Sequence, residues 1–213
     1  SLLLFLFAAA LVGGAAFALL YISIPLDPKE VLRIEASSAL YDSKGRLFHL
    51  RLSSNSEWQL PIPLSEMGRW LPRVAVGVED GRFYTHPGID LLAILRATSQ
   101  NLAAGRVVSG ASTITSQLIR LSLSEREPSR GVASPGRRAR TLTTKVREFI
   151  QALKLERILS KEQILELYLN HAPFGGNIRG VQAASLLYFG KPASKLSPGE
   201  ACLMIGMLKG PTL

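Results

Sequence analysis

The chain has 213 residues, which is enough for one substantial domain with an attached membrane segment. Its 25 Lys and Arg residues against 16 Asp and Glu residues give a formal net charge of +9, which favours polyanions, phosphorylated lipids and anionic membrane surfaces as partners. The single cysteine, Cys202, excludes an internal disulfide and a Cys-based zinc cluster, and its apolar neighbours predict that it is buried.

The N-terminal segment 2–26 contains no charged residue and is rich in Leu, Ala, Phe and Gly. As a helix it can cross a hydrocarbon core of about 30 Å. A cleaved signal peptide is the alternative, but the apolar run exceeds the usual signal core of about 7–15 residues and no small-residue cleavage site follows it. We therefore expect residues 1–26 to form an uncleaved transmembrane anchor, which argues against nucleic acid as a partner.

Residues 27–71 are predicted to form a β-hairpin and a linker. Two short apolar segments, 39–41 and 47–52, flank a polar stretch that contains Gly45, as is typical of a hairpin. Trp58 and Trp70 follow in a proline-containing segment. They suit either the bilayer interface or the core, and the sequence leaves both readings open.

Residues 72–213 show helical periodicity without repeats, and we expect a mainly α domain. Asp90 is a predicted N-cap of a helix that ends at Gly105. Ser160 and Ser197 each begin a capping box, so each predicts the start of another helix.

The segment 122–136 has no apolar period and predicts a mobile loop between two helices. Basic residues gather in and beside it: Arg120, Arg126, Arg130, Arg137, Arg138, Arg140, Lys145 and Arg147. They form either a solvated charged face or a site for a pyrophosphate or lipid headgroup next to the membrane.

The stretch 79–88 concentrates acids, aromatic residues and a histidine. If it is helical up to His86, then Glu79, Phe83 and His86 project from one face, with the carboxylate next to a ring and an imidazole. Such a carboxylate is a candidate general base, whereas the alternative is a solvated helix end.

Two further segments carry polar side chains on helical faces. Thr113, Gln117 and Arg120 share one face of a helix that follows a small-residue turn, which is either an anion site or only a capped helix start. In the amphipathic segment 141–159, Lys145 and Glu148 lie one turn apart, where a surface ion pair is the alternative to a functional role, and Leu142, Val146, Phe149, Ile150 and Leu153 are predicted to face inward.

Together these stretches resemble glycosyltransferase family 51, the peptidoglycan transglycosylases of class A penicillin-binding proteins and of monofunctional enzymes. The matching positions are Glu79, Asp80, Phe83, His86, Gly88, Gly110, Ser112, Thr113, Ile114, Thr115, Gln117, Lys145, Glu148 and the run 164–170. Thr144, Ser116 and Leu121 depart from the family pattern. Arg120 with Leu121, and residues 170–176, resemble the one-C subgroup.

The resemblance implies a mainly α, lysozyme-like domain with a small membrane-embedded subdomain, which polymerises lipid II with inversion and releases undecaprenyl pyrophosphate. It implies Glu79 as the general base and Glu148 as the second catalytic residue. Substrate-binding positions carried over from the motifs are Asp80, Phe83, His86, Ser112, Thr113, Gln117, Arg120, Lys145, Arg147 and Asn170. No cofactor or resident metal is expected, although Mg²⁺ or Mn²⁺ can share the charge of the pyrophosphate.

The expected partners are lipid II, the growing lipid-linked glycan, membrane lipids and other cell wall synthesis proteins. The expected location is the bacterial inner membrane, crossed once, with the catalytic domain on the outer side. A lysozyme-like hydrolase or lytic transglycosylase and an inactive membrane scaffold remain as alternatives. No Ser-x-x-Lys motif occurs, so we expect no transpeptidase domain within these residues.

Overall fold

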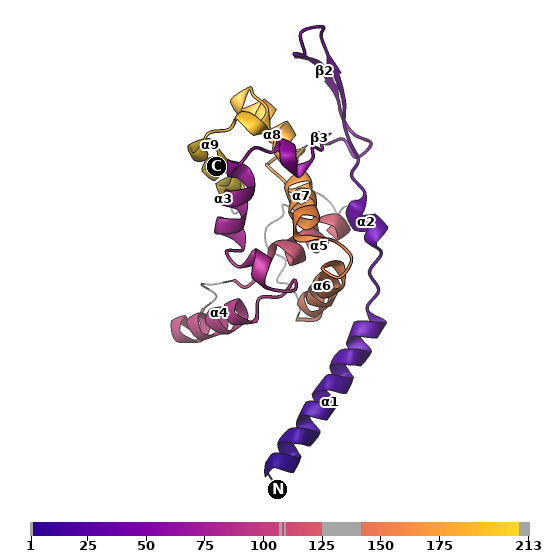
Figure 1. Cartoon of the computed structure of the whole chain (residues 1–213), viewed down its shortest axis with the longest axis vertical. Helices are drawn as coiled ribbons and strands as arrows, with labels where there is room; N and C mark the ends of the chain where they lie inside the picture. The colour runs from indigo at the N-terminus through magenta and orange to yellow at the C-terminus, as the bar shows by residue number, and fades with distance from the viewer. Residues whose placement is uncertain (1, 107, 109, 125–141, 209–213) are drawn as a thin grey trace.

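The computed structural model describes residues 2–106, 108, 110–124 and 142–208 (Figure 1). Their elements are α1 (Leu2–Ser23), α2 (Pro28–Leu32), β1 (Ser38–Tyr41), β2 (Leu47–Arg51), β3 (Trp58–Gln59), η1 (Leu64–Glu66), α3 (Trp70–Glu79), η2 (Phe83–Thr85), α4 (Leu91–Ala104), α5 (Ile114–Ser124), α6 (Leu142–Leu155), α7 (Lys161–His171), β4 (Ile178–Arg179), α8 (Val181–Phe189), η3 (Ala193–Lys195) and α9 (Pro198–Met207), where η marks a 3-10 helix. The prediction of a mainly α fold is confirmed.

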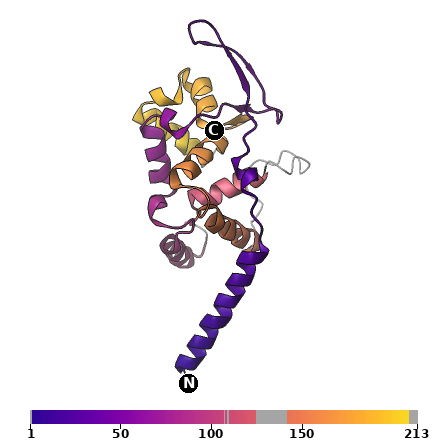
Figure 2. The same cartoon turned by 45° about the vertical axis from the view of Figure 1, so that its right-hand side comes forward.

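The apolar helix α1 projects away from the rest of the chain (Figures 1 and 2). Its segment Leu4–Ser23 has 20 residues with a mean hydropathy of 2.3 and lies outside the packed domain. Its length and composition therefore suit a membrane crossing. The helix ends just before Pro25, and Asp27 then caps α2 by accepting the backbone N–H of Lys29 over 2.9 Å.

The strands β1 and β2 form the predicted antiparallel hairpin. The carboxylate of Asp42 accepts the backbone N–H groups of Lys44 and Arg46, each over 2.9 Å, and so closes the turn. The hairpin points away from the domain on the side opposite the free end of α1 (Figure 1).

A second strand pairing was not predicted. The strand β3 runs parallel to β4, and Trp58 is paired with Ile178. Strands of two residues are too short to show an alternating pattern in the sequence. Trp58 and Trp70 both pack against the core, so the core reading of these two residues holds.

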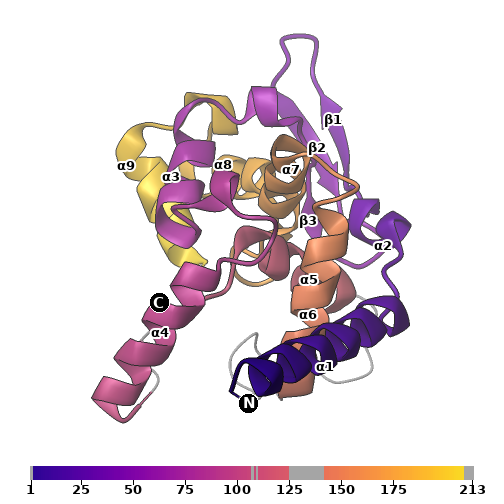
Figure 3. The same cartoon turned by 60° about the horizontal axis from the view of Figure 1, so that its bottom comes forward.

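The central helix of the domain is α7, with other helices around it (Figure 3). Its residues Ile164, Leu165 and Leu169 are fully buried, and it packs against α5 and α8. The predicted capping box is present, because Ser160 Oγ accepts the N–H of Gln163 while Gln163 Oε1 accepts the N–H of Ser160. Truncating one of these core leucines to Ala is expected to lower the free energy of unfolding by about 2–5 kcal/mol. The buried face of α7 therefore supports α5, which packs against it.

The helix α9 packs against α3 and also begins with its predicted capping box, at Ser197. Ala201 and Met204 are buried on its inner side. Cys202 is exposed, so its predicted burial is wrong. Because a helix makes one turn in about 3.6 residues, Cys202 falls on the outer face of α9 although its neighbours in sequence are apolar.

The helix α4 extends from the domain on the same side as α1 (Figures 1 and 2). Its predicted caps are confirmed: Asp90 accepts the N–H of Ala93, and Gly105 ends the helix with φ of 61°. Its outer leucines are largely exposed, with values of 70% for Leu91 and 77% for Leu102. An exposed apolar helix on the same side of the domain as α1 is what a small membrane-embedded subdomain requires.

One predicted boundary and one predicted burial need correction. Residues 122–124 continue α5, and Ser122 is buried, so the predicted loop does not begin there. Residues 125–136, the remainder of that loop, and the arginines up to Arg140 lie outside the described residues. In α6, Ile150 is buried as predicted, but Val146 is 40% exposed because it lies outside the face that packs against α5.

Candidate active site

Glu79 is the last residue of α3, and the backbone leaves the helix at Asp80, where φ is −157° and ψ is 73°. The predicted continuation of this helix to His86 is therefore wrong. The physical reason is tertiary, since Asp80 Oδ2 accepts the backbone N–H of Ile114, at the start of α5, over 3.0 Å. A carboxylate at a helix N-terminus is electrostatically favourable, and this contact is incompatible with a continuous helix from Glu79.

Phe83 begins the short helix η2 and is fully buried. Its ring lies against the core side of the loop, with the Lys161 Nζ atom 4.4 Å from the ring centroid. Phe83 thus has a packing role that holds the loop after Glu79 in place, and its predicted substrate contact stays a prediction.

The Glu79 carboxylate is held by α5. Gln117 donates from Nε2 to Glu79 Oε2 over 3.0 Å, and the Tyr168 hydroxyl of α7 lies 3.4 Å from Gln117 Oε1. Burial, followed by the negative charge of Glu79, raises the pKa of Tyr168, while Arg120 acts in the opposite sense. Tyr168 therefore stays protonated and can donate to the Gln117 amide, which in turn orients Glu79.

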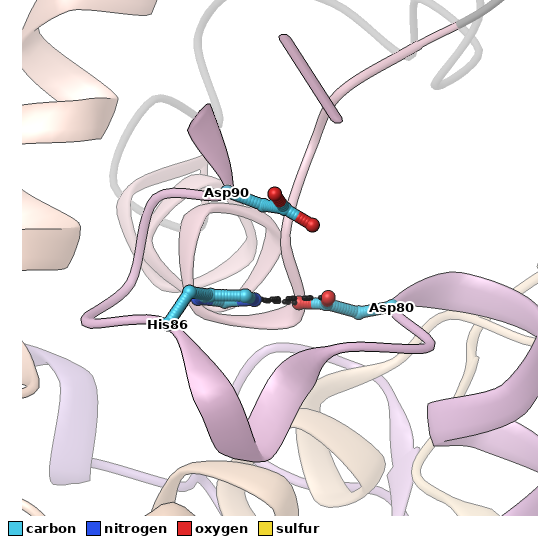
Figure 4. A group of neighbouring side chains, drawn as sticks. All are labelled: Asp80, His86 and Asp90. Atoms are coloured by element: carbon cyan, nitrogen blue, oxygen red, sulfur yellow. Dashed lines mark hydrogen bonds and ion pairs between the residues drawn. The ribbon is translucent and has the colours of Figure 1, made fainter. Parts of the chain in front are cut away.

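Asp80 and His86 form a buried pair within the loop (Figure 4). His86 Nε2 lies 2.9 Å from Asp80 Oδ1, while His86 Nδ1 accepts the backbone N–H of Gly88 over 3.2 Å. Because Nδ1 accepts this N–H, Nε2 is the ring nitrogen that donates to Asp80. The structure shows that both residues position the loop after Glu79, and their predicted substrate contacts stay predictions.

Asp90 lies beside this pair and receives bonds from Arg82 Nε, over 3.0 Å, and from the Ala93 N–H, over 2.9 Å. Burial alone would raise the pKa of Asp90, but the hydrogen bond from Ala93 and the Arg82 guanidinium together hold that pKa below its ordinary value. Asp90 therefore stays ionised at neutral pH and joins the start of α4 to the loop after Glu79.

The oxygen and nitrogen atoms of Asp80, His86 and Asp90 come within 4.8 Å of one another, which raises the question of a metal site (Figure 4). Both ring nitrogens of His86 are already engaged, and the Asp90 carboxylate is matched by Arg82. A cation would have to displace these bonds. The donor set therefore fits a hydrogen-bonded support better than a metal centre.

The turn before α5 is closed by Thr113 and Ser116. Thr113 Oγ1 accepts the N–H of Ser116 over 3.1 Å, and Ser116 Oγ accepts the N–H of Thr113 over 3.0 Å. This is the reciprocal arrangement of a capping box, with Ser116 at the position where the family usually has Gln. Thr113 also donates to the Gly88 carbonyl over 2.7 Å and is buried, so its hydroxyl is used in joining two loops.

Gly88 is required by close backbone approach. Its φ is 92°, and a Cβ at this position would lie 2.8 Å from the Ala152 carbonyl oxygen of α6. Any side chain would push α6 away from the loop. The glycine of the first motif thus joins the loop after Glu79 to the helix that carries Glu148.

Asn170 has a similar structural task. Its Nδ2 donates to the Ile62 carbonyl over 2.8 Å and its Oδ1 accepts the Ile62 N–H over 3.1 Å. The side chain is buried, and its amide pairs with the linker. Asn170 thus joins α7 to the residues before α3, and its role in substrate binding stays a prediction.

A polar cavity of about 270 Å³ lies beside Glu79, between the loop after α3, the start of α4 and the turn before α5. Of the predicted site residues it gathers Glu79, Asp80, Ser112 and Thr113. It also contains Arg82 and Arg96, which the sequence analysis did not select. Arg82 lies inside the first motif and could have been noticed there, whereas Arg96 gave no signal.

The remaining predicted residues lie on α5 and α6, away from this cavity. Glu148 is buried on α6, which packs against α5. Lys145 and Arg147 are exposed on α6, and Arg120 is half-buried on α5. These four described residues do not line the cavity beside Glu79, so their action on a pyrophosphate stays a prediction.

Two further charged residues, Lys161 and Glu156, support the loop after Glu79. Lys161 donates from Nζ to the His86 carbonyl and to Glu156 Oε1, each over 2.7 Å. Lys161 and Glu156 are largely buried and were not selected from the sequence. The contact of Lys161 with the His86 carbonyl joins residues 75 positions apart, so no local pattern could have indicated it.

These features define a class of protein. It is a helical, lysozyme-like domain on an apolar helix, with a glutamate that lines a polar cavity. The family model described as transglycosylase matches residues 45–213, and the chain belongs to this family. Its likeness to named relatives marks it as the glycosyltransferase domain of a class A penicillin-binding protein, and so as an enzyme domain.

The chain is 33% identical over 99% of its length to penicillin-binding protein 1A of Clostridium tetani. It is 36% identical over 95% of its length to penicillin-binding protein 1A of Aquifex aeolicus, and 37% identical over 73% to penicillin-binding protein 1C of Escherichia coli. These alignments cover 25%, 26% and 18% of the respective relatives, so the chain spans about a quarter of their length or less. The similar identities do not single out the one-C subgroup.

Proposed function

We propose that this domain polymerises lipid II into β-1,4 glycan, with inversion at the donor sugar and release of undecaprenyl pyrophosphate. The observation that carries the proposal is the placement of Glu79, which lines a polar cavity while Gln117 holds one of its oxygens. A carboxylate in that position can take the proton from the acceptor's 4-hydroxyl as this hydroxyl attacks the donor. An inverting displacement of this kind needs no covalent intermediate.

The leaving pyrophosphate is the second part of the proposal. Charge builds on it in the transition state, so cations aimed at it lower the barrier. Arg120 on α5, with Lys145 and Arg147 on α6, belong to two helices that pack together. We assign them this task, with Glu148 orienting the group.

A divalent cation can join the same group. Mg²⁺ is commonly held by one or two carboxylates together with substrate phosphates, and Glu148 provides one carboxylate beside these cations. The chain's own residues bind and orient the pyrophosphate, and Mg²⁺ or Mn²⁺ would neutralise part of its charge when bound.

The membrane arrangement follows from the helices α1 and α4. Both present apolar side chains on the same side of the domain (Figure 1). A substrate with a polyprenyl tail is confined to the bilayer, so a domain held there by α1 meets it at high local concentration. We propose a single crossing of the inner membrane with the domain on the outer side, where other cell wall synthesis proteins are accessible.

The deciding experiment is incubation of the purified protein with lipid II, followed by separation of the products by length. Lengthening glycan chains support the proposal. Conversely, shortening of preformed glycan would favour a lysozyme-like hydrolase, and absence of turnover in every bilayer composition would favour a scaffold.

A further inference from the structure

The C-terminal end of α1 is joined to α6 by side chains of α6. Lys154 donates from Nζ to the Ile24 carbonyl over 2.6 Å, and Gln151 donates from Nε2 to the Pro25 carbonyl over 2.9 Å. These bonds engage two backbone carbonyl groups in the segment that directly follows α1. They also hold α1 at a defined position next to α6 (Figure 3).

A second cavity, also of about 270 Å³, lies at this junction. Four residues of α1, namely Phe17, Ala18, Tyr21 and Ile22, form one wall, and Leu153 of α6 with Arg157, in the turn just after α6, forms the other. It shares no lining residue with the cavity beside Glu79. The walls are apolar except for the guanidinium of Arg157 and the hydroxyl of Tyr21.

Positive charge is concentrated at one end of this cavity. The Lys154 ammonium lies 4.8 Å and the Arg157 guanidinium 5.2 Å from the centroid of the Tyr21 ring. Lys154 uses one bond for Ile24, and an ammonium has three donors. The two cations can therefore receive an anion above the ring, while Phe17 and Ala18 lie one turn deeper along α1.

The expected depth of these residues in the bilayer indicates which kind of molecule occupies the cavity. Tyr21 lies close to the end of the apolar span Leu4–Ser23, which is the headgroup level for a helix that crosses a bilayer. The cavity thus has its cations at the headgroup and its apolar wall at the upper acyl chains. A phosphate joined to a fatty acyl chain matches both features.

We propose that the junction of α1 and α6 binds one anionic glycerophospholipid. Its phosphate lies at Arg157 and Lys154, and one acyl chain lies between Ala18 and Leu153. Because α6 also carries Glu148, the bound lipid fixes the height of this helix relative to the membrane surface. The site is independent of the glycosyltransferase reaction, and its test needs no substrate.

The test uses the full chain, purified in detergent and offered phosphatidylglycerol or phosphatidylcholine before native mass spectrometry. The unchanged protein should retain one phosphatidylglycerol in preference to phosphatidylcholine. Arg157→Gln removes the charge and Ala18→Phe fills the apolar part, and each should lower retention about tenfold, as expected for the loss of a charge-assisted bond or of the space for a chain.

Matched controls are available in the chain. Arg73→Gln removes an exposed charge from α3, and Ala16→Phe adds the same ring to the opposite face of α1, so both should retain the lipid. Circular dichroism of each variant checks that helical content is kept.

Three results would overturn the proposal. The first is equal retention of the two phospholipids, and the second is undiminished retention by Ala18→Phe and Arg157→Gln. The third is preferential retention of undecaprenyl phosphate over phosphatidylglycerol, which would assign the cavity to the polyprenyl carrier.

Discussion

Gln117 donates a hydrogen bond of 3.0 Å to Glu79, although the two residues lie on different helices. The bond engages Oε2 of the carboxylate. A fixed carboxylate keeps its proton-accepting oxygen in one orientation, and this geometry is what a general base needs before the substrate arrives.

Replacing Glu79 by Gln should abolish polymerisation of lipid II and leave the fold intact. The amide keeps the shape of the side chain but cannot accept the proton, so the rate should fall by about 10²–10⁴-fold. The measurement is the initial rate of glycan formation together with a thermal unfolding curve. A variant with unchanged stability and a near-normal rate would remove Glu79 from the mechanism.

Replacing Tyr168 by Phe should lower kcat by about two- to tenfold with little change in KM, because one neutral hydrogen bond is lost and Gln117 is held less firmly. Tyr188→Phe is the matched control. Its hydroxyl donates to the Phe174 carbonyl over 2.7 Å, so a similar bond is lost away from Glu79.

The pH dependence of kcat shows whether Tyr168 positions Gln117 and Glu79 or only packs in the core. A positioning role predicts a changed pH–rate profile in Tyr168→Phe and an unchanged one in Tyr188→Phe. Identical profiles and rates in both variants would reduce Tyr168 to a packing residue.

Replacing Arg120 by Ala should weaken use of the donor substrate, since a cation near the leaving pyrophosphate stabilises the transition state. The expected loss in kcat/KM is about tenfold or more. Arg73→Ala, which removes an exposed arginine of α3, is the control for loss of net charge. Equal rates for the two variants would exclude a specific role for Arg120.

Asp90 should make stability depend on pH in the acid range. Its pKa is depressed in the folded state, so its contribution is present above the unfolded value, about 3.9, and is lost as pH falls through the lower folded value. Asp90→Asn retains an N-cap but removes the charge opposite Arg82.

The variant should accordingly be less stable at pH 7, by about 1 kcal/mol or less for a partly exposed pair, and the difference should shrink below pH 4. Thermal unfolding at several pH values measures this. A difference that stays constant from pH 7 to pH 3 would show that the charge of Asp90 does not contribute.

Replacing Lys161 by Met should destabilise the loop after Glu79, because it leaves the buried Glu156 carboxylate without its cation and frees the His86 carbonyl. Removing one partner of such a pair costs about 3–5 kcal/mol. Chemical denaturation provides the value. The double variant Lys161→Met with Glu156→Gln should recover part of the loss, and failure to recover any would point to the ring contact with Phe83 instead.

Several parts of the structure could be read from the sequence because their causes are local. The apolar span of α1, the hairpin turn at Asp42 and the caps at Asp90, Ser160 and Ser197 each depend on residues within a few positions of one another. The resemblance of the motifs to the transglycosylases also depends on short stretches of sequence. It identified Glu79 and Gln117, whose contact only the fold shows.

What only the tertiary structure decided are the contacts between segments far apart in the chain. Asp80 ends α3 because it bonds to Ile114, Gly88 is needed because Ala152 passes beside it, and Asn170 is occupied by Ile62. Each of these contacts gives a motif residue a supporting role that the sequence did not predict. A local pattern records the propensity of a segment, whereas the termination of a helix and the partner of a buried polar group depend on which distant backbone groups folding brings next to it.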